Sequence, residues 1–363
     1  MSGDATPTRP TDNALQPTIA ALIATFEHAK TFGSLIQIPP QLNAGVHKLL
    51  QTVQQTMESG DLYARAAAQD VWPLLRQAQV LAMQFDAVVA NPPYMGGKGM
   101  NSALKDYAKA TFPDSKSDLF AMFMERGFGW GKPSGFNSMV TMQSWMFLSS
   151  FEAMRESLLR DRTIETMAHL GSRAFSEITG EIVQTTAFVF LKNHTKGFKP
   201  VFFRLIDGLE DQKRNALLLG HNRFSEIQQE ELLRIPGFPM AYWTTSSIRQ
   251  IFSNNILLDD VADVRQGLRT GDNDRFLRNW NEVNLAKVGF GYIDVVSAHQ
   301  SNKKWFPYNK GGSQRKWYGN NDCLISFDTD SYDILSRQGN KLPSRQYYFM
   351  PSVTSDFLIR KEL

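Results

Sequence analysis

Apolar residues recur every three or four positions through the first quarter of the chain, a spacing typical of amphipathic helices. Ile19, Leu22 and Phe26, for example, share one helical face. The full pattern predicts three helices, over residues 18–33, 42–59 and 61–84. Residues 1–17 are instead rich in Thr, Pro, Asp and Gly, and they predict a disordered leader.

After residue 84 the pattern changes to short, β-branched runs that predict buried strands. The first run covers residues 85–90 and stops at Asn91-Pro92-Pro93-Tyr94. Further strands are expected at 138–142, 163–170 and 183–191, with helices at 119–127 and 149–160. Strands that alternate with helices predict an α/β domain with a largely parallel sheet and an antiparallel hairpin at its end.

The periodicity weakens after residue 205. Residues 206–260 contain several Gly and Pro turn signals and predict a connector. From Val261 the composition shifts toward Asn, Gly, Arg and aromatic residues, which predicts a second, more irregular domain over residues 261–363.

Composition narrows the class of protein. The 363 residues are 42% hydrophobic and 21% charged, which is ordinary for a soluble chain with a core. They contain neither an apolar run of 18 residues nor a targeting segment, so we expect a cytoplasmic enzyme without a membrane partner. The single Cys323 and six scattered His residues exclude a disulfide scaffold and a zinc module, and we expect no metal. The net charge of +3 permits a nucleic-acid partner without requiring one.

The tetrapeptide Asn91-Pro92-Pro93-Tyr94 carries the most specific chemistry in the chain. Its prolines remove two N–H donors and leave carbonyls and the Asn91 side-chain oxygen as acceptors beyond the strand. Two acceptors suit a primary amine on an aromatic ring, because they hold both N–H bonds while the lone pair attacks an electrophile. Tyr94 can stack on such a ring, and strand ends are where open α/β sheets bind ligands. The structural alternative is an ordinary Asn-Pro turn that closes a strand.

From about Thr18 to about Pro351 the chain resembles the DNA adenine-N6 methyltransferases that use S-adenosylmethionine and carry a (D/N)PPY motif. More narrowly, it is similar to the methyltransferases of BREX phage-defence systems, which belong with restriction-modification enzymes. The resemblance rests on Phe85–Tyr94, Lys116–Phe120, Thr141–Phe147, Val183–Phe188 and Arg265–Leu277.

The resemblance implies a partial Rossmann-like S-adenosylmethionine-dependent methyltransferase domain over residues 85–205, with N-terminal helices before it and an incomplete target-recognition domain after residue 260. It also implies site-specific methylation of double-stranded DNA on a flipped adenine. Asn91 (side-chain oxygen) and Pro92 (carbonyl) would hold the amino group. Pro93 would stiffen the loop, and Tyr94 would stack on the adenine.

S-adenosylmethionine is the cofactor that the resemblance implies for the complete enzyme, yet its usual binding turn is missing upstream of Asn91. The related enzymes place a glycine-rich turn after a first strand, whereas this chain has helices and the isolated Gly33, Gly45 and Gly60 there. The chain therefore resembles an internal piece of a longer enzyme, from a split gene or a truncated reading frame. Its expected partners are DNA, an upstream methyltransferase fragment and other BREX subunits.

Residues 302–318 alternate five basic with five aromatic residues and contain no acid, a pattern that favours phosphate contacts and base stacking. The residues expected to contact DNA are Lys98, Arg265, Arg269, Lys303, Lys304, Trp305, Lys310, Arg315, Lys316 and Trp317. The structural alternative for this stretch is two strands and a loop with solvated lysines and core aromatics.

Two other functions remain open at this point. The chain could be a non-catalytic fragment that binds DNA or partner subunits, or a protein or RNA methyltransferase, because the same tetrapeptide serves other amide and amine acceptors. The extent of the resemblance argues against the second. His169, His194 and Cys323 are expected to be structural.

Overall fold

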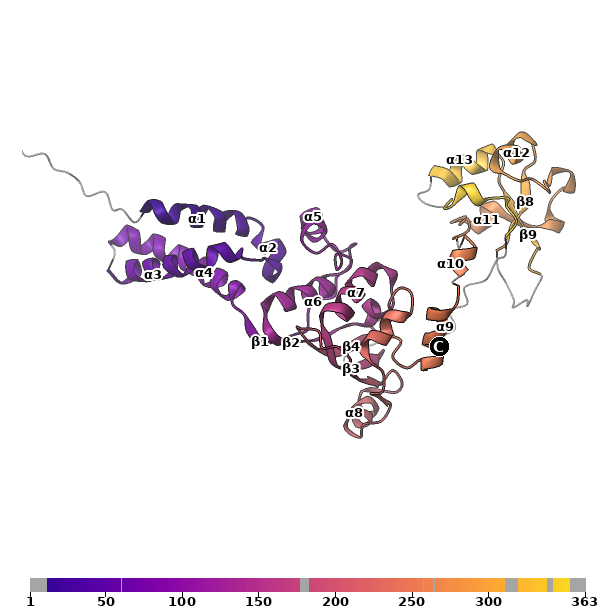
Figure 1. Ribbon diagram of the computed structural model, residues 1–363. Helices are drawn as coiled ribbons and strands as arrows, with labels where there is room; N and C mark the ends of the chain where they lie inside the picture. The colour runs from indigo at the N-terminus through magenta and orange to yellow at the C-terminus, as the bar shows by residue number, and fades with distance from the viewer. Residues whose placement is uncertain are drawn as a thin grey trace, which may run out of the picture. The chain divides into compact units, whose positions relative to one another are not determined.

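The computed structural model of the protein describes residues 12–59, 61–176, 183–256, 258–263, 265–310, 319–337 and 342–352. The chain divides into two compact units, Met1–Asn255 and Ile256–Leu363, and each is described by itself (Figure 1). The division falls close to Val261, where the change in composition places the second domain.

Four helices precede the sheet. They are α1 (Asp12–Phe26), α2 (Ala29–Phe32), α3 (Asn43–Ser59) and α4 (Leu62–Ala82), with 3₁₀ helices at Gly33–Leu35 and Pro40–Leu42. The leader predicted over residues 1–17 is too long, because Leu15 is buried beside Leu22 and extends the apolar face of α1. The remainder of that predicted leader, residues 1–11, lies outside the described residues.

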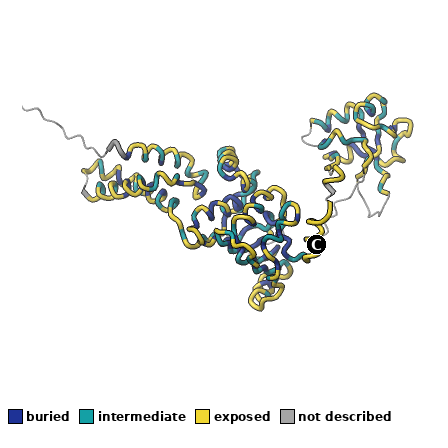
Figure 2. Tube along the Cα trace, in the orientation of Figure 1, coloured by how far each residue is buried: buried dark blue, intermediate teal, exposed yellow. Residues whose placement is uncertain are grey.

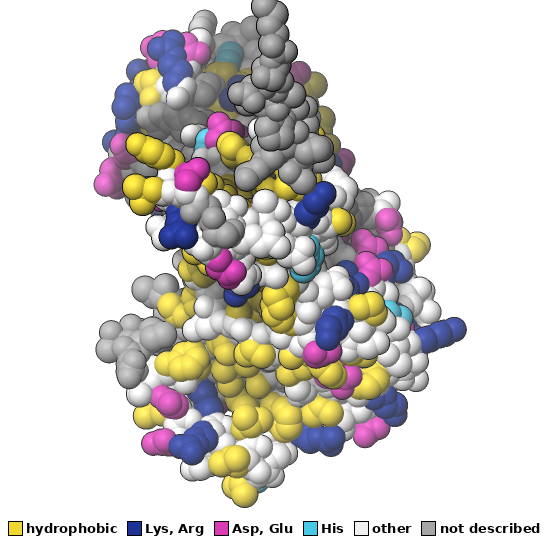
Figure 3. Space-filling view, turned by 90° about the vertical axis from the view of Figure 1, so that its left-hand side faces the viewer, with side chains coloured by type: hydrophobic (Ala, Val, Ile, Leu, Met, Phe, Trp, Pro, Cys, Tyr) yellow, Lys and Arg dark blue, Asp and Glu magenta, His cyan; other side chains and the backbone are white. Residues whose placement is uncertain are grey.

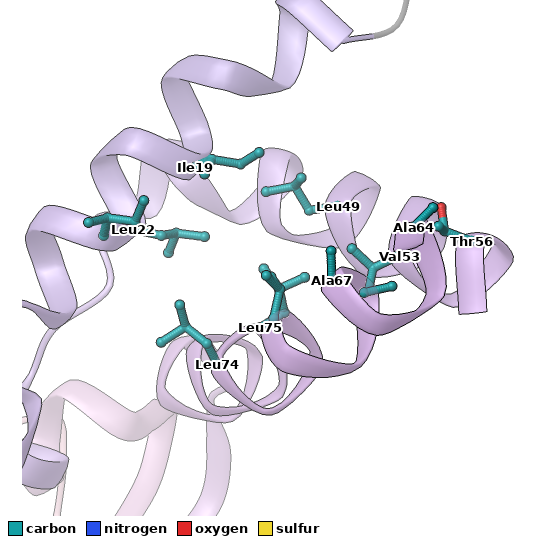
Figure 4. Close-up of a pocket in the computed structure, with 12 residues that line it drawn as sticks. Ile19, Leu22, Leu49, Val53, Thr56, Ala64, Ala67, Leu74 and Leu75 are labelled. Atoms are coloured by element: carbon teal, nitrogen blue, oxygen red, sulfur yellow. The ribbon is translucent and has the colours of Figure 1, made fainter. Parts of the chain in front are cut away.

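The helical segment has its own apolar core. Leu22, Leu49 and Leu75, from α1, α3 and α4, are each at most 4% exposed. Beside them an apolar cavity of about 370 Å³ lies between the three helices, with the labelled leucine and alanine side chains directed into it (Figure 4). Its lining is apolar except for Thr56.

A six-stranded sheet with the order β1-β2-β4-β3-β5-β6 forms the centre of the first unit. Its strands are β1 (Phe85–Ala90), β2 (Gly131–Met142), β3 (Thr163–Gly171), β4 (Thr185–Leu191), β5 (Val201–Arg204) and β6 (Arg223–Phe224). β1 pairs in parallel with β2, and β3 with β5, whereas β4 and β6 run antiparallel to their neighbours. Four of the six strands therefore share one direction, and the fold is α/β as predicted.

The antiparallel hairpin differs in position from the prediction. β3 and β4 form it, but β4 lies between β2 and β3 and not at the end of the sheet. The central position buries Phe188 and Phe190 of β4, whose rings pack against Trp145. Burial of these three large rings is a physical reason for inserting the returning strand into the sheet.

The prediction that residues 85–90 form a buried strand is wrong, because β1 is the edge of the sheet. Val89 of β1 is 77% exposed, and Phe136 on the neighbouring β2 is 42% exposed. The outer N–H and C=O groups of β1 have no strand partner among the described residues, so this edge is open to pairing.

Helices cover one face of the sheet. α6 (Leu119–Trp130) and α7 (Glu152–Asp161) contribute to the main core, in which Met139, Phe188 and Met167 are at most 2% exposed. Their neighbours on the opposite face, such as Val140 and Ala187, are only half-buried. Figure 2 shows the buried segments gathered in the sheet region, and Figure 3 shows many apolar side chains open on one surface. Val140 and Ala187 on the opposite face are thus incompletely covered by the described residues.

Residues 206–243 are not the predicted connector but part of the first unit. They contain α8 (Glu210–Leu218), β6 and a 3₁₀ helix (Gln229–Arg234), and α9 (Ser246–Asn254) follows them. Leu232, Met240 and Tyr242 are at most 2% exposed in the main core. Because these side chains are buried in the core, the segment is not the free linker that the Gly and Pro signals had indicated.

Further short elements complete the first unit. α5 (Ser102–Thr111) was not predicted, although Asn101 caps it and Leu104 and Ala108 have helical spacing. The 3₁₀ helices Gln143–Met146 and Ser149–Phe151 follow β2.

Arg126 of α6 ties the helical segment to the sheet. Its guanidinium donates hydrogen bonds to the carbonyls of Ser34 (3.3 Å), Ile36 (2.9 Å) and Leu81 (3.1 Å). The guanidinium carbon also lies 4.2 Å from the centre of the Trp130 ring. Burial lowers the pKa of Arg126 to about 10, so the group remains charged at neutral pH. One buried cation therefore joins two segments that precede the sheet, residues 34–36 and the end of α4.

The second unit is small and irregular. Its elements are α10 (Leu258–Val261), α11 (Asn273–Phe276), β7 (Leu277–Asn279), α12 (Val295–Gln300), β8 (Trp305–Pro307), β9 (Cys323–Ser326) and α13 (Thr329–Arg337), with 3₁₀ helices at Trp280–Glu282, Leu285–Lys287 and Arg345–Tyr347. The strands form an antiparallel sheet in the order β7-β9-β8. Phe276, Phe306 and Phe327 are buried at its core. Across the described parts of both units, no helix has the length and hydropathy to span a membrane.

We expect Arg126→Met to lower the free energy of unfolding of the first unit by about 2 to 5 kcal/mol, because three carbonyls lose a charged donor. Arg160→Met is the control, since Arg160 forms an exposed pair with Glu156 on one helix. Urea unfolding followed by tryptophan fluorescence measures both. Equal midpoints for the two variants would contradict the role given to Arg126.

Candidate active site

The carboxyl ends of four strands lie at one edge of the sheet, because β1, β2, β3 and β5 run in the same direction. Asn91 follows β1, Gln143 follows β2, His169 lies near the end of β3, and Arg204 ends β5. This edge, which we call the carboxyl edge, is where α/β sheets generally bind their ligands.

The predicted tetrapeptide forms a polar corner at this edge. Asn91 is exposed and Pro92 is buried, so the proline anchors the corner while the amide faces solvent. The Tyr94 hydroxyl lies 3.3 Å from the Asn91 Oδ1 atom and 3.3 Å from the Val140 carbonyl oxygen. The Tyr94 hydroxyl can thus donate either to Asn91 within the corner or to the neighbouring β2.

The Tyr94 ring packs against the main core. It meets the Phe120 ring edge-on, with 6.1 Å between ring centroids and an interplanar angle of 88°. Burial raises the pKa of the Tyr94 hydroxyl, so it stays protonated and remains a donor. Because a hydroxyl has one proton, Tyr94 can serve only one of its two acceptors at a time.

The loop after Tyr94 is held by Asp118, the N-cap of α6. An Asp118 carboxylate oxygen accepts hydrogen bonds from the backbone N–H groups of Met95 (2.9 Å) and Phe120 (3.3 Å). Leu119 donates its backbone N–H to the Met95 carbonyl (3.1 Å). Burial raises the pKa of Asp118, and these N–H donors oppose that rise. Lys98, predicted to grip DNA, is exposed in this loop.

A chain of hydrogen bonds runs along the carboxyl edge from Tyr242 to Gln184. Gln143 donates its Nε2–H to the Gln184 Oε1 atom (2.5 Å), and its own Oε1 lies 2.7 Å from His169 Nε2. His169 Nδ1 lies 3.2 Å from the Tyr242 hydroxyl. One set of donors satisfies every pair: Tyr242 donates to His169, His169 to Gln143, and Gln143 to Gln184.

This assignment requires a neutral imidazole. Burial lowers the pKa of His169 to about 4, and the positive charges of Arg204 and Lys213 lower it further. His169 is therefore neutral at pH 7, with one ring nitrogen donating and the other accepting. The neutral ring fixes the direction of the amides of Gln143 and Gln184, which stand at the carboxyl edge.

Lys213 of α8 fixes two other segments at this edge. Its buried ammonium donates to the carbonyls of Ser172 (2.8 Å), Leu205 (2.9 Å) and Ile206 (3.1 Å), and also to that of Leu170. Burial lowers the pKa of Lys213. The segments that follow β3 and β5 are thus anchored from one side chain.

These residues were not found from the sequence. His169 was interpreted as structural, and Gln143, Gln184 and Lys213 were not considered. Gln143 and Gln184 lie in segments that carry the family resemblance, and each lies close to the end of a strand. A search of those segments for polar residues near strand ends would have indicated both. The pairing of β2 with β4, which brings the two amides together, could not be foreseen.

The predicted DNA-contacting residues of the second unit have mixed surroundings. Arg265 and Arg269 are exposed, and Arg265 forms an ion pair with Asp263 (2.6 Å). Lys304 and Lys310 are exposed, whereas Lys303 donates to the Ala286 carbonyl (2.7 Å).

The aromatic residues of that stretch divide between surface and core. Trp305 is half-buried on β8 beside Lys304, while Phe306 is 1% exposed. The structural alternative therefore holds for Phe306. Arg315, Lys316 and Trp317 lie outside the described residues.

The described residues do not fit the expected cofactor on their own. Among the described residues before Asn91, β1 is the first strand and only helices precede it, so that part of the structure contains no turn from a strand into a helix upstream of Asn91. The residues at or just after the ends of the four codirectional strands include Asn91, Gln143 and Arg204, none of them a carboxylate that could hold a ribose.

Comparison with known proteins gives a consistent set of relatives. Residues 24–175 match the family described as Eco57I restriction-modification methylase. The chain is 46% identical over 347 residues to the adenine-specific methyltransferase BrxX of Escherichia coli O9:H4 (strain HS), which covers 95% of this chain. It is 38% identical over 337 residues to the adenine-specific methyltransferase PglX of Lacticaseibacillus casei (strain Zhang), covering 89% of this chain.

In each case the chain spans 28% of the length of the curated relative. Among solved structures, the type ISP restriction-modification enzyme LlaBIII bound to DNA aligns with 83% of this chain and 23% of its own, at 12% identity and a TM-score of 0.39. The predicted relationship to adenine-specific methyltransferases is confirmed by the two curated sequences.

The neutral state of His169 predicts a pH dependence of stability. The folded pKa lies below the unfolded value of 6.5, so the stabilisation is complete above about pH 6.5 and is lost as the pH falls toward 4, by up to about 3 kcal/mol. In His169→Gln this loss is absent, and the free-energy difference between parent and variant should shrink over that range. Urea unfolding at several pH values measures it, with the exposed His221→Gln as control. A constant difference would refute the assignment.

Proposed function

Since this chain is related over nearly all of its length to part of the adenine-specific methyltransferases BrxX and PglX, we propose that it supplies the base-holding half of a DNA adenine-N6 methyltransferase. The substrate is a flipped adenine in double-stranded DNA, and the setting is a BREX or restriction-modification defence system in the cytoplasm. S-adenosylmethionine is the proposed methyl donor of the complete enzyme.

The main support for this proposal is that the exposed Asn91 side-chain oxygen at the carboxyl edge can still accept a hydrogen bond. An amide oxygen has two lone pairs, and the Tyr94 hydroxyl uses at most one of them. The Pro92 carbonyl accepts no backbone hydrogen bond from the described residues. Two acceptors next to one another suit the two N–H bonds of an exocyclic amine and leave its lone pair directed outward.

The adenine must leave the duplex to reach this corner, because its amino nitrogen is otherwise paired. Tyr94 is proposed to stack on the extruded base. Its ring is braced by Phe120 and its hydroxyl by Val140, so the stacking surface is already oriented before the base arrives.

The second unit is proposed to contact DNA outside the flipped base. Its exposed cations suit phosphate contacts, and Lys98 offers a further one from the loop beside Tyr94. The proposed DNA-contacting set remains Lys98, Arg265, Arg269, Lys303, Lys304, Trp305, Lys310, Arg315, Lys316 and Trp317.

The methyl donor is proposed to be held by another polypeptide segment that completes the sheet. The open edge of β1 offers unpaired backbone groups, and the exposed Val89 and Phe136 offer apolar surface beside them. A segment that adds a strand to β1 would pair these backbone groups, and a helix on the incompletely covered face would cover apolar surface. We propose an upstream methyltransferase fragment as that segment, and other BREX subunits as further partners.

A second candidate function is a non-catalytic fragment that binds DNA or partner subunits. The absence of a strand and glycine turn before β1 among the described residues favours it. The two candidates differ in one respect, which is whether a complementing segment restores methyl transfer.

We expect Asn91→Ala to abolish methyl transfer by the complemented enzyme, because one of two acceptors for the amine is removed. Asn193→Ala is a matched control, since Asn193 is exposed and follows β4, which ends at the opposite edge. Transfer of a radiolabelled methyl group to DNA is the measurement, and circular dichroism checks folding. Normal methyl transfer by Asn91→Ala would contradict the proposed role of the corner.

Calorimetric titration with S-adenosylmethionine tests the proposed second segment. We expect no saturable heat from the chain alone, and saturable heat once a fragment with the glycine-rich turn is added. Val89→Asp should abolish this restoration, because a charge enters the surface beside β1.

Val296→Asp changes a valine of the second unit that is 64% exposed, and it should leave the restoration intact. Saturable binding by the chain alone would refute the need for a partner, without bearing on Asn91.

A further inference from the structure

Arg204 is a half-buried cation without a counterion among the described residues. It ends β5 at the carboxyl edge, and its backbone N–H donates to the Asn222 carbonyl (3.0 Å). Among the described residues its guanidinium forms no ion pair or hydrogen bond, and its Nε atom is buried without a partner. The charge on this side chain is therefore not used within the described structure.

The guanidinium is nevertheless held in place by aromatic rings. Its central carbon lies 5.3 Å from the centre of the Trp243 ring. Trp243 is in turn packed edge-on against Tyr242, at 5.0 Å and 89°, and lies 5.9 Å from Phe147. Phe147 is 36% exposed, so this aromatic group reaches the surface. Arg204 is thus oriented by stacking and not by a charged partner.

Arg204 differs from the buried cation Lys213 in its hydrogen bonds. Lys213, also buried near the carboxyl edge, donates to several backbone carbonyls, as its desolvated charge requires. Arg204 has no such acceptor, although a partly buried charge without one is costly. An arginine kept in this state is matched to an acceptor that binds from outside, and a planar guanidinium suits the oxygens of a phosphate.

The position of Arg204 fits a nucleic-acid strand that also reaches the polar corner. Arg204 is aligned with His169 in the parallel pairing of β3 and β5. It is separated from β1 by four strand spacings, roughly 19 Å along the carboxyl edge. At about 3.4 Å per nucleotide of a duplex strand, this corresponds to about five or six base pairs from the adenine held at Asn91.

We propose that Arg204, stacked on Trp243, binds a backbone phosphate of the DNA about half a helical turn from the target adenine, with Phe147 forming the wall of this subsite. The inference rests on the proposed function and deepens it, because it assigns the first unit a DNA contact in addition to Lys98.

The test is the salt dependence of DNA binding by the full chain, measured by fluorescence anisotropy with a labelled duplex of about 30 base pairs. Arg204→Gln should weaken binding about tenfold at low salt, since one charged contact is lost. It should also reduce the slope of log Kd against log salt concentration by about 0.9, the value of one phosphate contact.

Two further variants serve as controls. Arg223→Gln, on the adjacent β6, removes an exposed arginine that bonds only Ser225 among the described residues, and should leave the slope unchanged. Arg204→Lys keeps the charge and should keep the slope, even if Arg204→Gln proves unstable. Equal slopes for the parent and Arg204→Gln, or loss of the slope in Arg204→Lys, would overturn the subsite alone. No binding of DNA by the parent chain at low salt would overturn the proposed function with it.

Discussion

The shared direction of β1, β2, β3 and β5 is the constraint on which the candidate site depends. Codirectional strands end at one edge, so side chains from Asn91 to Arg204, 113 positions apart in the sequence (204 − 91), come to lie along a single line. The insertion of β4 does not disturb this arrangement, because its amino end joins the same edge and brings Gln184 to Gln143. Polar groups from these four strands can then act on one bound molecule.

The local parts of this arrangement could be predicted from the sequence. The apolar run before Asn91 indicated β1, and the pattern over residues 119–127 indicated α6, which Asp118 caps. Such features depend on neighbouring residues, so local pattern is sufficient to find them. The amphipathic helices before the sheet were found in the same way, although α1 begins earlier because Leu15 is buried.

The parts that depend on long-range pairing could not be predicted. The burial of β1 was misjudged because a run such as Phe85–Ala90 does not reveal whether one or two strands flank it. The core residues after residue 205, such as Leu232, were hidden by turn signals, since those signals describe the local backbone and not what a segment packs against. His169 was taken as structural because its partners Gln143 and Tyr242 are 26 and 73 positions away.

The single hydroxyl proton of Tyr94 has a consequence for how the corner is kept ready. With its bond directed to Asn91, the hydroxyl satisfies the amide oxygen while the corner is empty. When an incoming amine takes over that oxygen, the same proton can turn to the Val140 carbonyl, which lies at an equal distance. The Tyr94 hydroxyl can therefore donate its proton in both the empty and the filled corner, and the exchange requires only a rotation about one C–O bond.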